Sequence, residues 1–385
     1  MLSWFRRAKY TMADSSQVQK AGAGASQFQV GVLNVGIDEK RAREICDEKI
    51  SDAIRDLTGE AFGVAKARVE DLVTMTLAKI QKQKADMSSF ADPKFQREIA
   101  KAQSSAASSD RKSDIEMLSE LLVARMDGKL QRKTHTGISR AIEIVSDVDD
   151  DELLALTAVH AVGCYYPSSI KGHSIKEGLF ALNRLYEQLK VSDLPQGEGW
   201  MENLNMLDAI IISPIGGFKK IVEYFEEKLD GYVCAGIGMA SPEFNTAKQI
   251  LKSAGLSENI LVPHQALQGY VRLPVVRLPE CSDLQLLKYV TNRTDGKPMP
   301  MISTPSLQEV QAMEKVVALY AKDASLLTKV KKAFEDEWAK FPALVEMQKW
   351  FDGLHKSFEI TKVGMALAYV NAKRCAPDLP PLRLE

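Results

Sequence analysis

The sequence predicts a mainly α-helical protein of the α+β class, with a helical-bundle body, a small α/β segment and an N-terminal strand. Apolar residues recur at helical spacing through most of the chain, and capping residues with prolines mark many helix starts. Strand patterns are few and short. The 385 residues provide for two or three hydrophobic cores. We divide the chain into a tail with an oligomerisation strand (1–36), a helical body (37–205), a small α/β segment (206–300) and C-terminal helices (301–385).

The composition excludes a general nucleic-acid binder. Basic and acidic side chains balance, 50 against 51, for a formal net charge of −1, whereas nucleic-acid binding needs an excess of Lys and Arg. The five cysteines are far apart and form no Cys-x-x-Cys pair, which predicts reduced thiols, no structural zinc and a cytoplasmic location. No run of about 18 apolar residues occurs, so no transmembrane helix is expected. We expect no cofactor.

Residues 1–10, MLSWFRRAKY, bring aromatic and basic side chains together without the order of a signal peptide. One hypothesis is a weak peripheral contact with an anionic membrane, made by aromatic side chains below the surface and basic ones at it. The alternative is a terminus without a fixed role. We favour the alternative, because ten residues bury little apolar area.

Residues 26–32 alternate between apolar and polar side chains, which is the period of a β-strand. Phe28, Val30 and Val32 share one face of it. The next predicted strand is far along the chain, and a strand alone leaves its backbone groups without partners. The strand therefore joins the distant sheet or pairs with copies of itself. We favour self-association, and so expect a homo-oligomer.

Helical spacing dominates the body from residue 37 to 205. Asp38 is expected to cap a helix whose apolar stripe continues to Ile80, with a bend at Thr58–Gly59 because Gly is unfavourable inside helices. The stripe suits a coiled coil or a bundle core, and the bundle is the default. Asp92–Pro93 begins a helix that runs toward Ser104 and is followed by a Ser/Ala linker. Further helices are expected at 115–126, 137–148 and 178–189.

Four acidic residues, 149–152, precede another helix. They suit a divalent metal ion, but Asp149 and Glu152 also have the spacing of a capping box, and acidic side chains interact favourably with a helix N-terminus. We favour capping and predict no metal-ligating residue. His160 lies on the apolar face of this helix and is interpreted as a hydrogen-bonded core residue.

The segment from 206 to 300 is the part with α/β character. A short apolar strand at 208–212, a Gly-Gly turn, a helix over 221–229 and a second strand at 231–237 predict a β-α-β unit with a right-handed crossover. Ser241–Pro242 begins a helix that Gly255 ends. Residues 261–262 and 270–273 are expected to add strands.

The turn after the first of these strands is a candidate anion site. Ser213, Gly216, Gly217 and Lys219 resemble a turn that surrounds a phosphate with backbone N–H groups, although no complete phosphate-binding motif is present. A tight connection between strand and helix explains the glycines equally well. His264 and Arg272 stand in the densest group of functional side chains, where they suit an anionic ligand or bonds to the backbone.

We predict no catalytic residue. Glu226 and Lys228 have the acidic-x-Lys spacing of metal-dependent nucleases, but that arrangement needs a strand, and here the two side chains diverge on a helix. The G-x-S-x-G motif of serine hydrolases does not occur.

Helices close the chain. They are expected to begin after Thr304–Pro305, near Leu326 and at Pro342. A last helix in ITKVGMALAYVNAKRC carries small residues, among them Gly364, that allow close approach of a neighbour.

Several segments, taken in order, resemble an uncharacterised family of bacterial proteins: GIDEKRAREI, ISPIGGF, GYVCAGI, LVPH and ITKVGMALAYVNAKR. The N-terminal strand with its following helix is also similar to an adaptor-like segment of proteins linked to phage defence. The resemblance implies a conflict or stress role only by association, and it carries over no catalytic residue.

Together these observations lead to two hypotheses about function. The first is a non-enzymatic, oligomerising interaction protein of the bacterial cytoplasm with a role in phage defence or stress response and a protein partner. The second is a nucleotide- or phosphate-binding sensor or enzyme that uses the turn at 213–220.

Overall fold

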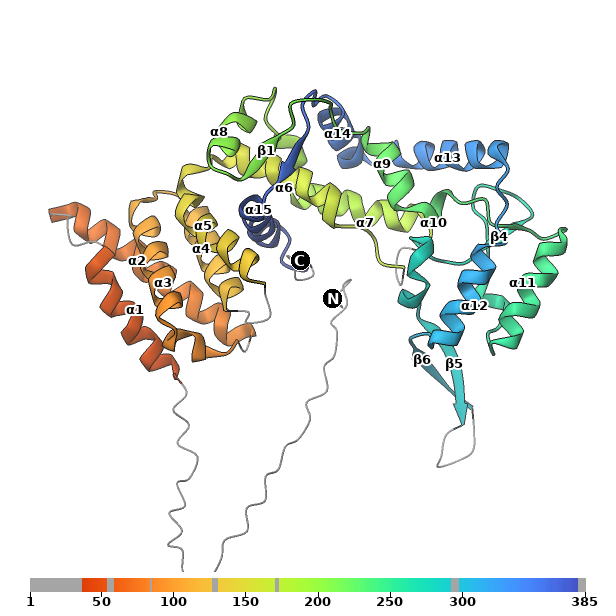
Figure 1. Ribbon diagram of the computed structural model, residues 1–385, viewed down its shortest axis with the longest axis horizontal. Helices are drawn as coiled ribbons and strands as arrows, with labels where there is room; N and C mark the ends of the chain where they lie inside the picture. Colours follow the sequence, from red (N-terminus) through yellow and green to blue (C-terminus); the bar gives the residue numbers. More distant parts are fainter. Residues whose placement is uncertain are drawn as a thin grey trace, which may run out of the picture. The chain divides into compact units, whose positions relative to one another are not determined.

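The structure is a computed structural model that describes residues 37–53, 59–83, 85–126, 131–169, 173–291 and 298–379. It forms two compact units, and each is described by itself (Figure 1). Unit 1 holds the described residues up to Asp149 with Leu207–Ala209 and the chain from Ile360 onward, and unit 2 holds Asp150–Met206 and Ile210–Glu359. Because the end of the chain returns to unit 1, this division differs from the predicted boundaries at 205 and 300.

Helices dominate the described residues, and the strands are short and form small sheets, which confirms the predicted mainly α, α+β class. Two predictions lie outside the described residues. These are the membrane contact at residues 1–10 and the strand that carries Phe28, Val30 and Val32.

Unit 1 is a helical bundle. Its elements are α1 (Glu39–Ala53), α2 (Gly59–Gln83), η1 (Met87–Ala91), α3 (Pro93–Ser108), α4 (Lys112–Arg125), α5 (Arg132–Ile144), η2 (Val145–Asp147) and α15 (Lys362–Cys375), where η marks a 3-10 helix. α2 packs against α3 and α4, and α15 packs against α4 and α5. Gly137 permits this approach, because a Cβ there would lie 2.7 Å from the Lys362 carbonyl oxygen.

The predicted helix starts and the apolar stripe are confirmed in unit 1. The Asp38 carboxylate accepts the Arg41 N–H at 2.8 Å, and Asp92 caps α3 with Pro93 at the first helical position. Gly59, at the predicted bend, has φ of +60° and begins a separate helix. Val69 and Leu72 on the predicted face of α2 are buried, so the stripe is part of a bundle core.

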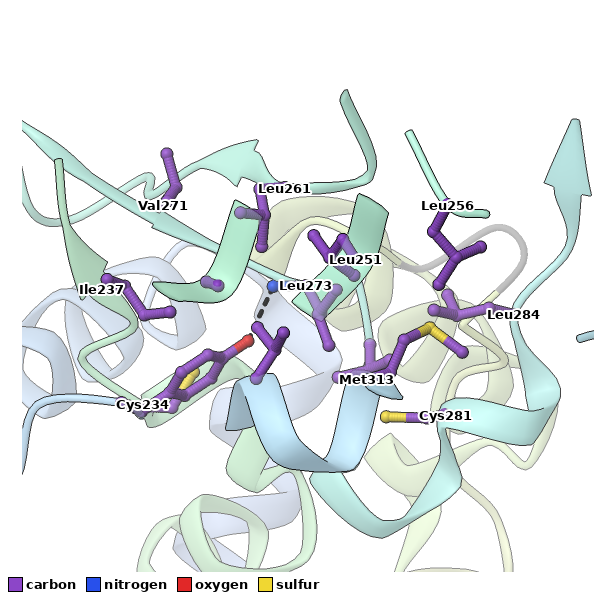
Figure 2. Close-up of a cluster of buried hydrophobic side chains, with 14 of the residues drawn as sticks. Cys234, Ile237, Leu251, Leu256, Leu261, Val271, Leu273, Cys281, Leu284 and Met313 are labelled. Carbon is purple, nitrogen blue, oxygen red and sulfur yellow. Dashed lines mark hydrogen bonds between the residues drawn. The ribbon is translucent and has the colours of Figure 1, made fainter. Parts of the chain in front are cut away.

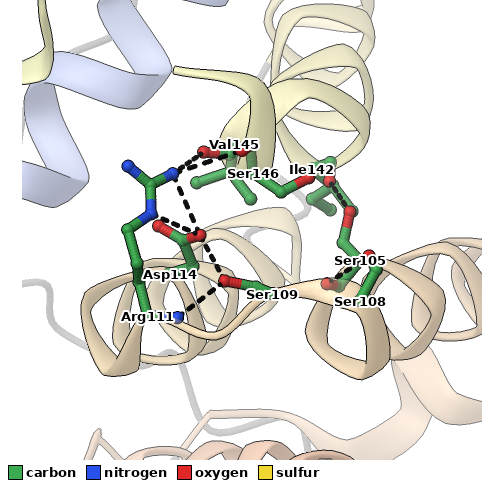
Figure 3. Close-up of polar contacts among 8 residues, drawn as sticks. All are labelled: Ser105, Ser108, Ser109, Arg111, Asp114, Ile142, Val145 and Ser146. Carbon is green, nitrogen blue, oxygen red and sulfur yellow. Dashed lines mark hydrogen bonds and ion pairs between the residues drawn. The ribbon is translucent and has the colours of Figure 1, made fainter. Parts of the chain in front are cut away.

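The predicted Ser/Ala linker was wrong, because α3 continues through it to Ser108. Two hydroxyls there donate to backbone carbonyls: that of Ser105 to Ile142 at 3.1 Å, and that of Ser108 to Ser105 at 3.0 Å (Figure 3). The helix ends at Ser109, whose hydroxyl donates to Asp114. Packing of α3 on α5 buries this turn, and tertiary burial outweighs the weak helix propensity of serine.

Unit 2 contains the remaining helices and all the described strands. Its helices are α6 (Asp150–Cys164), α7 (Ile175–Gln188), η3 (Val191–Asp193), α8 (Trp200–Met206), α9 (Ile221–Lys228), α10 (Asp230–Val233), α11 (Pro242–Ser253), η4 (Glu258–Ile260), η5 (Leu278–Asp283), α12 (Leu307–Val317), α13 (Ala324–Trp338) and α14 (Pro342–Phe351). Its strands are β1 (Ile210–Ile212), β2 (Ile237–Gly238), β3 (Val262–Pro263), β4 (Tyr270–Arg272), β5 (Leu286–Thr291), β6 (Pro298–Ser303) and β7 (Phe358–Ile360), the last of which ends at the unit boundary.

The predicted β-α-β unit was wrong. β1 pairs with β7 from near the end of the chain, and the first three residues of the predicted second strand, 231–233, belong to the helix α10. The strand that remains, β2, pairs antiparallel with β4 in a sheet of order β2-β4-β3. Gly231, Tyr232 and Val233 in α10 are all buried, and a short run that is buried on every side has no periodicity to separate helix from strand.

A hydrophobic core joins the three-stranded sheet to α11, η5 and α12 (Figure 2). Leu251, Leu273 and Met313 are fully buried in it. The dashed line at Leu273 in Figure 2 marks its N–H donating to the Tyr320 hydroxyl at 2.7 Å. Leu286 at the start of β5 also belongs to this core, which therefore holds the base of the hairpin that follows.

The hairpin of β5 and β6 was not predicted. Its strands are antiparallel, with Leu286 opposite Ser303 and Thr291 opposite Pro298. In Figure 1 it extends away from α11 and α12. Proline at 298 and at 300 weakens the strand pattern of the sequence, which is why the second strand escapes a search for alternating β-formers.

Candidate functional site

The predicted anion-binding turn is held by another loop of unit 2. The Ser213 N–H donates to the Ser357 carbonyl at 2.8 Å, and the Ser357 N–H donates back to the Gly216 carbonyl at 3.3 Å. Gly216 has φ of +88°, and a Cβ on Gly217 would lie 3.1 Å from the His355 carbonyl oxygen. The two glycines thus serve a left-handed turn and a close backbone approach.

A carboxylate of the chain already occupies the N-terminus of α9, where a phosphate was predicted. Asp352 accepts the Ile221 N–H at 2.8 Å, and its carbonyl accepts the Lys220 ammonium at 2.8 Å. Lys219 forms an ion pair with Glu227. A phosphate here would compete with the Asp352 carboxylate for the same N–H group and the same helix dipole.

His264 and Arg272 are engaged by the backbone elsewhere in unit 2. His264 Nε2 lies 2.8 Å from the Cys234 carbonyl oxygen, and Nδ1 accepts the N–H groups of Ala266 and Leu267. The Arg272 guanidinium is buried and donates to four carbonyl oxygens, those of Gly231, Leu273, Val275 and His173. The six predicted ligand residues are therefore held in two places by different neighbours, and ligand binding by either group stays a prediction.

The structure assembles a different group of ionisable side chains at the C-terminal end of α6. Lys228, the last residue of α9, donates to the carbonyl of Val162 at 3.0 Å and to that of Gly163. Its ammonium lies 5.5 Å from the centre of the Tyr166 ring and 5.4 Å from that of Tyr224. A cation between two aromatic faces at the negative end of a helix is favourably placed.

A thiol and an imidazole complete this group, which we call the α6-end cluster: His160, Cys164, Tyr166, Tyr224 and Lys228. The Cys164 Sγ lies 3.6 Å from Nδ1 of His160, one helical turn earlier. Cys164 is exposed, whereas His160 is buried, and its Nε2 has no hydrogen-bond partner among the described residues.

Burial sets the protonation of the α6-end cluster. It lowers the pKa of His160 to about 4 and, with a smaller contribution from the charge of Lys228, keeps the imidazole neutral near pH 7. Burial also lowers the pKa of Lys228 to about 8. Although the Cys164 residue is exposed, partial removal of its thiol from water raises its pKa, and Lys228 opposes that shift. The cluster thus combines a neutral thiol, a neutral imidazole and an amine that loses its proton easily.

An ion pair flanks the cluster. The Tyr166 hydroxyl donates to Glu280 at 2.9 Å, and Arg277 pairs with the same carboxylate at 2.5 Å while its guanidinium lies 4.9 Å from the centre of the Tyr166 ring. These contacts fix the Tyr166 ring beside Lys228. Arg277 lowers and Glu280 raises the pKa of Lys228, so the two charges of the pair oppose each other there.

Sequence analysis missed this cluster as a site. His160 was interpreted as a core residue and Lys228 was considered only with Glu226, because neither has a local motif. Lys228 is 65 residues from Gly163, and Tyr166 is 114 residues from Glu280. Only packing of α9 and η5 against the end of α6 brings them together.

A small cavity in unit 1 is too small for a ligand. Its volume is about 10 Å³, which is room for about one water molecule. It is lined by Cys46, Leu72, Val73, Thr76, Leu77, Phe90, Phe95, Ile99, Gln103 and Leu122.

The described residues contain no cluster of three or more His, Cys, Asp or Glu side chains placed to hold a metal ion. None of the helices described for the chain combines the length and the apolar character that crossing a membrane requires.

Comparison with known proteins gives a family and no activity. A family model described only as ":-like", which stands for an uncharacterised family, matches residues 36–380. No curated protein and no solved structure matches the chain.

Proposed function

We propose that this protein acts as a non-enzymatic, self-associating interaction protein. The chain belongs to the uncharacterised family whose model matches residues 36–380. The observation that carries this proposal is the β5–β6 hairpin. No third strand of the described residues pairs with it. A two-stranded hairpin alone is only marginally stable in water, and a third strand would stabilise it.

The prolines of β6 decide which edge of the hairpin accepts a strand. Proline has no N–H group, so the ladder bonds fall on the pairs that alternate with the proline pairs, among them Lys288 with Met301 and Val290 with Met299. It follows that Leu287 and Tyr289 direct their N–H and C=O groups outward along β5. The outer edge of β6 lacks two donors, at Pro298 and Pro300, which leaves β5 as the competent edge.

The strand that we propose for this edge is residues 26–32 of a second copy. Its alternating pattern, with Phe28, Val30 and Val32 on one face, suits addition to an open sheet edge. Apolar surface is also available near the hairpin, because Ile302 and Leu307 are 66% and 75% exposed. A third strand would satisfy the outward backbone groups of β5.

The proposal also covers the compartment, the biological role and the partners of the protein. Five free thiols without a disulfide support a reducing compartment, the bacterial cytoplasm. A role in phage defence or stress response, and a second protein as partner, rest on the resemblance of the sequence segments alone. Peripheral membrane contact through residues 1–10 would be weak and would add to, not replace, self-association.

Light scattering after size-exclusion chromatography tests the proposal on the full-length protein at micromolar concentration. We expect an oligomer that becomes monomeric when Phe28, Val30 and Val32 are changed together to serine. The matched control changes Gln27 and Gln29 on the opposite face to serine and should remain oligomeric. A monomeric wild-type protein, or an oligomer unaffected by the triple change, would overturn the proposal.

A second pair of variants tests the edge. Tyr289→Pro removes an outward N–H of β5, and we expect it to dissociate the oligomer, while Tyr289→Thr keeps that N–H and should not. Circular dichroism of both variants confirms that the helices are intact. An oligomer that persists in Tyr289→Pro but not in the triple serine variant would refute the β5 edge and retain self-association.

A further inference from the structure

We propose that Cys164 and Lys228 form an acyl-acceptor site, in which an acyl thioester from solution transfers its acyl group to the Cys164 thiol and then to the Lys228 amine. The site lies within unit 2 and is independent of the proposed self-association. Its product is an N-acyl lysine at the end of α9.

Access is the first requirement, and Cys164 meets it. Cys164 and the preceding Gly163 are both exposed at the end of α6. A thioester in solution can therefore approach Cys164, although its thiol is partly removed from water, whereas Cys46, Cys234 and Cys281 are buried. The other incompletely buried thiol, that of Cys375, has Asn371 as its neighbour, at 4.0 Å.

Proximity is the second requirement. Lys228 Nζ donates to the carbonyl of Gly163, the residue directly before Cys164. The amine therefore lies within a few bond lengths of the chain that carries the thiol, and each group perturbs the pKa of the other. Transfer between two groups held this close has the advantage of an intramolecular reaction.

The transfer takes two steps, and the lowered pKa of Lys228 suits the second. In the first, the Cys164 sulfur attacks the thioester carbonyl, its S–C bond forms, the bond to the carrier sulfur breaks, and the thiol proton passes to the carrier thiolate. His160 Nδ1 lies 3.6 Å from the sulfur, and the imidazole, which is neutral near pH 7, orients the thiol through the hydrogen bond between them. In the second, the Lys228 nitrogen attacks the Cys164 thioester, an amide forms, and the amine proton returns to the Cys164 sulfur.

Burial makes Lys228 a better acceptor than an ordinary lysine. With a pKa of about 8, about half of its side chains are unprotonated at pH 8. A lysine at the usual value of about 10.4 is less than about 1% unprotonated at that pH. The tyrosine rings on either side hold the amine near the end of α6 rather than in bulk water.

Acylation would also alter the structure that Lys228 supports. The ammonium donates to the carbonyls of Val162 and Gly163 at the end of α6, where a positive charge is favourable. An acyl-lysine has no charge and a single N–H to donate. The modification would therefore loosen the last turn of α6, which gives the site a structural readout.

The test uses full-length protein and S-acetyl-N-acetylcysteamine, a small acetyl thioester, at pH 8, with peptide mass spectrometry over time. We expect acetylation of Lys228 to be at least tenfold faster than that of Lys219 and Lys220. These two control lysines directly precede α9 and have no neighbouring thiol. Cys164→Ser should lower the rate at Lys228 several-fold, to that of direct acetylation of its amine, and leave the rates at the two control lysines unchanged. Lys228→Arg, which retains the positive charge at α6, should accumulate the Cys164 thioester.

Two results would overturn the proposal. One is equal acetylation of Lys228 in the wild type and in Cys164→Ser, since it would mean that the thiol plays no part. The other is the lack of a Cys164 thioester in Lys228→Arg under conditions where other exposed groups react. Because Cys164 is exposed and arginine retains the cation, both variants should fold, and thermal unfolding of each verifies it.

Discussion

Arg272 is the residue whose replacement should destabilise unit 2 most clearly. The residue is 2% exposed, and its guanidinium donates to carbonyl oxygens at 3.0, 3.0, 3.1 and 2.6 Å. Arg272→Met keeps much of the aliphatic stem and removes all four bonds. Three of the acceptors, Gly231, Leu273 and Val275, lie in or beside the core of unit 2, so their carbonyl groups would lose a partner away from water.

The magnitude follows from the acceptors. A buried polar group that loses its partner costs about 1–3 kcal/mol. The four losses are not additive, and relief from burying the guanidinium opposes them. We therefore expect a decrease of about 4 kcal/mol in the free energy of unfolding, or roughly 8–16 °C in Tm for a unit of this size.

Urea unfolding followed by circular dichroism measures this change. Arg184→Met, at an exposed position on α7, is the matched control and should change stability by less than about 0.5 kcal/mol. Arg272→Lys keeps the charge without the planar guanidinium, and its decrease in the free energy of unfolding should lie between those of Arg272→Met and Arg184→Met. A change below about 1 kcal/mol in Arg272→Met would refute the structural role and return Arg272 to the predicted ligand site.

Three further predictions concern other parts of unit 2. Gly231→Ala should destabilise by about 3 kcal/mol in urea unfolding, because its Cβ would lie 2.3 Å from the Val275 carbonyl oxygen, whereas Gly163→Ala, with open space around the new methyl, should change stability by less than about 1 kcal/mol. The pKa of His160 is lowered to about 4 from 6.5, so between these pH values the unfolded chain binds more protons than the folded one. The free energy of unfolding should therefore fall by about 3 kcal/mol as the pH drops from 6.5 to 4. If the free energy of unfolding of His160→Leu depended on pH in the same way, His160 would not be the cause. Asp352→Ala removes the cap of α9, so we expect the free energy of unfolding to fall by about 1 kcal/mol and Tm to fall with it. A rise in Tm on addition of phosphate that appears only in this variant would show that the carboxylate had filled an anion site.

Local signals in the sequence were sufficient to predict most helices of the described chain. Asp92–Pro93, Ser241–Pro242 and Pro342 begin helices where predicted, because proline acts within the first helical turn, and at Asp92 the side chain also caps the helix. The apolar stripe of α2 was also predictable, since its period of 3.6 is repeated over 25 residues. The strand at residues 26–32 has the same kind of local signal but stays a prediction.

Elements without a long period could not be assigned in this way. Residues 104–108 are rich in serine, and only burial against α5 makes them helical. Residues 231–233 are all buried, and no pattern along the chain separates their helix from a strand. β1 was located correctly, but its partner β7 lies about 150 residues away, and pairing at that range depends on the whole fold.

The sequence by itself determined the class of the protein, the starts of its helices and the faces that they bury, because each depends on residues within a turn or two. The tertiary structure alone decided the roles of the polar side chains. Arg272 and His264 were visible in the sequence as functional groups. Only folding brought four carbonyl groups to Arg272 and three backbone groups to His264. Lys228 and Cys164 were ordinary in sequence, and they acquired a shared environment because the ends of α9 and α6 meet, where removal from water changes the pKa of each.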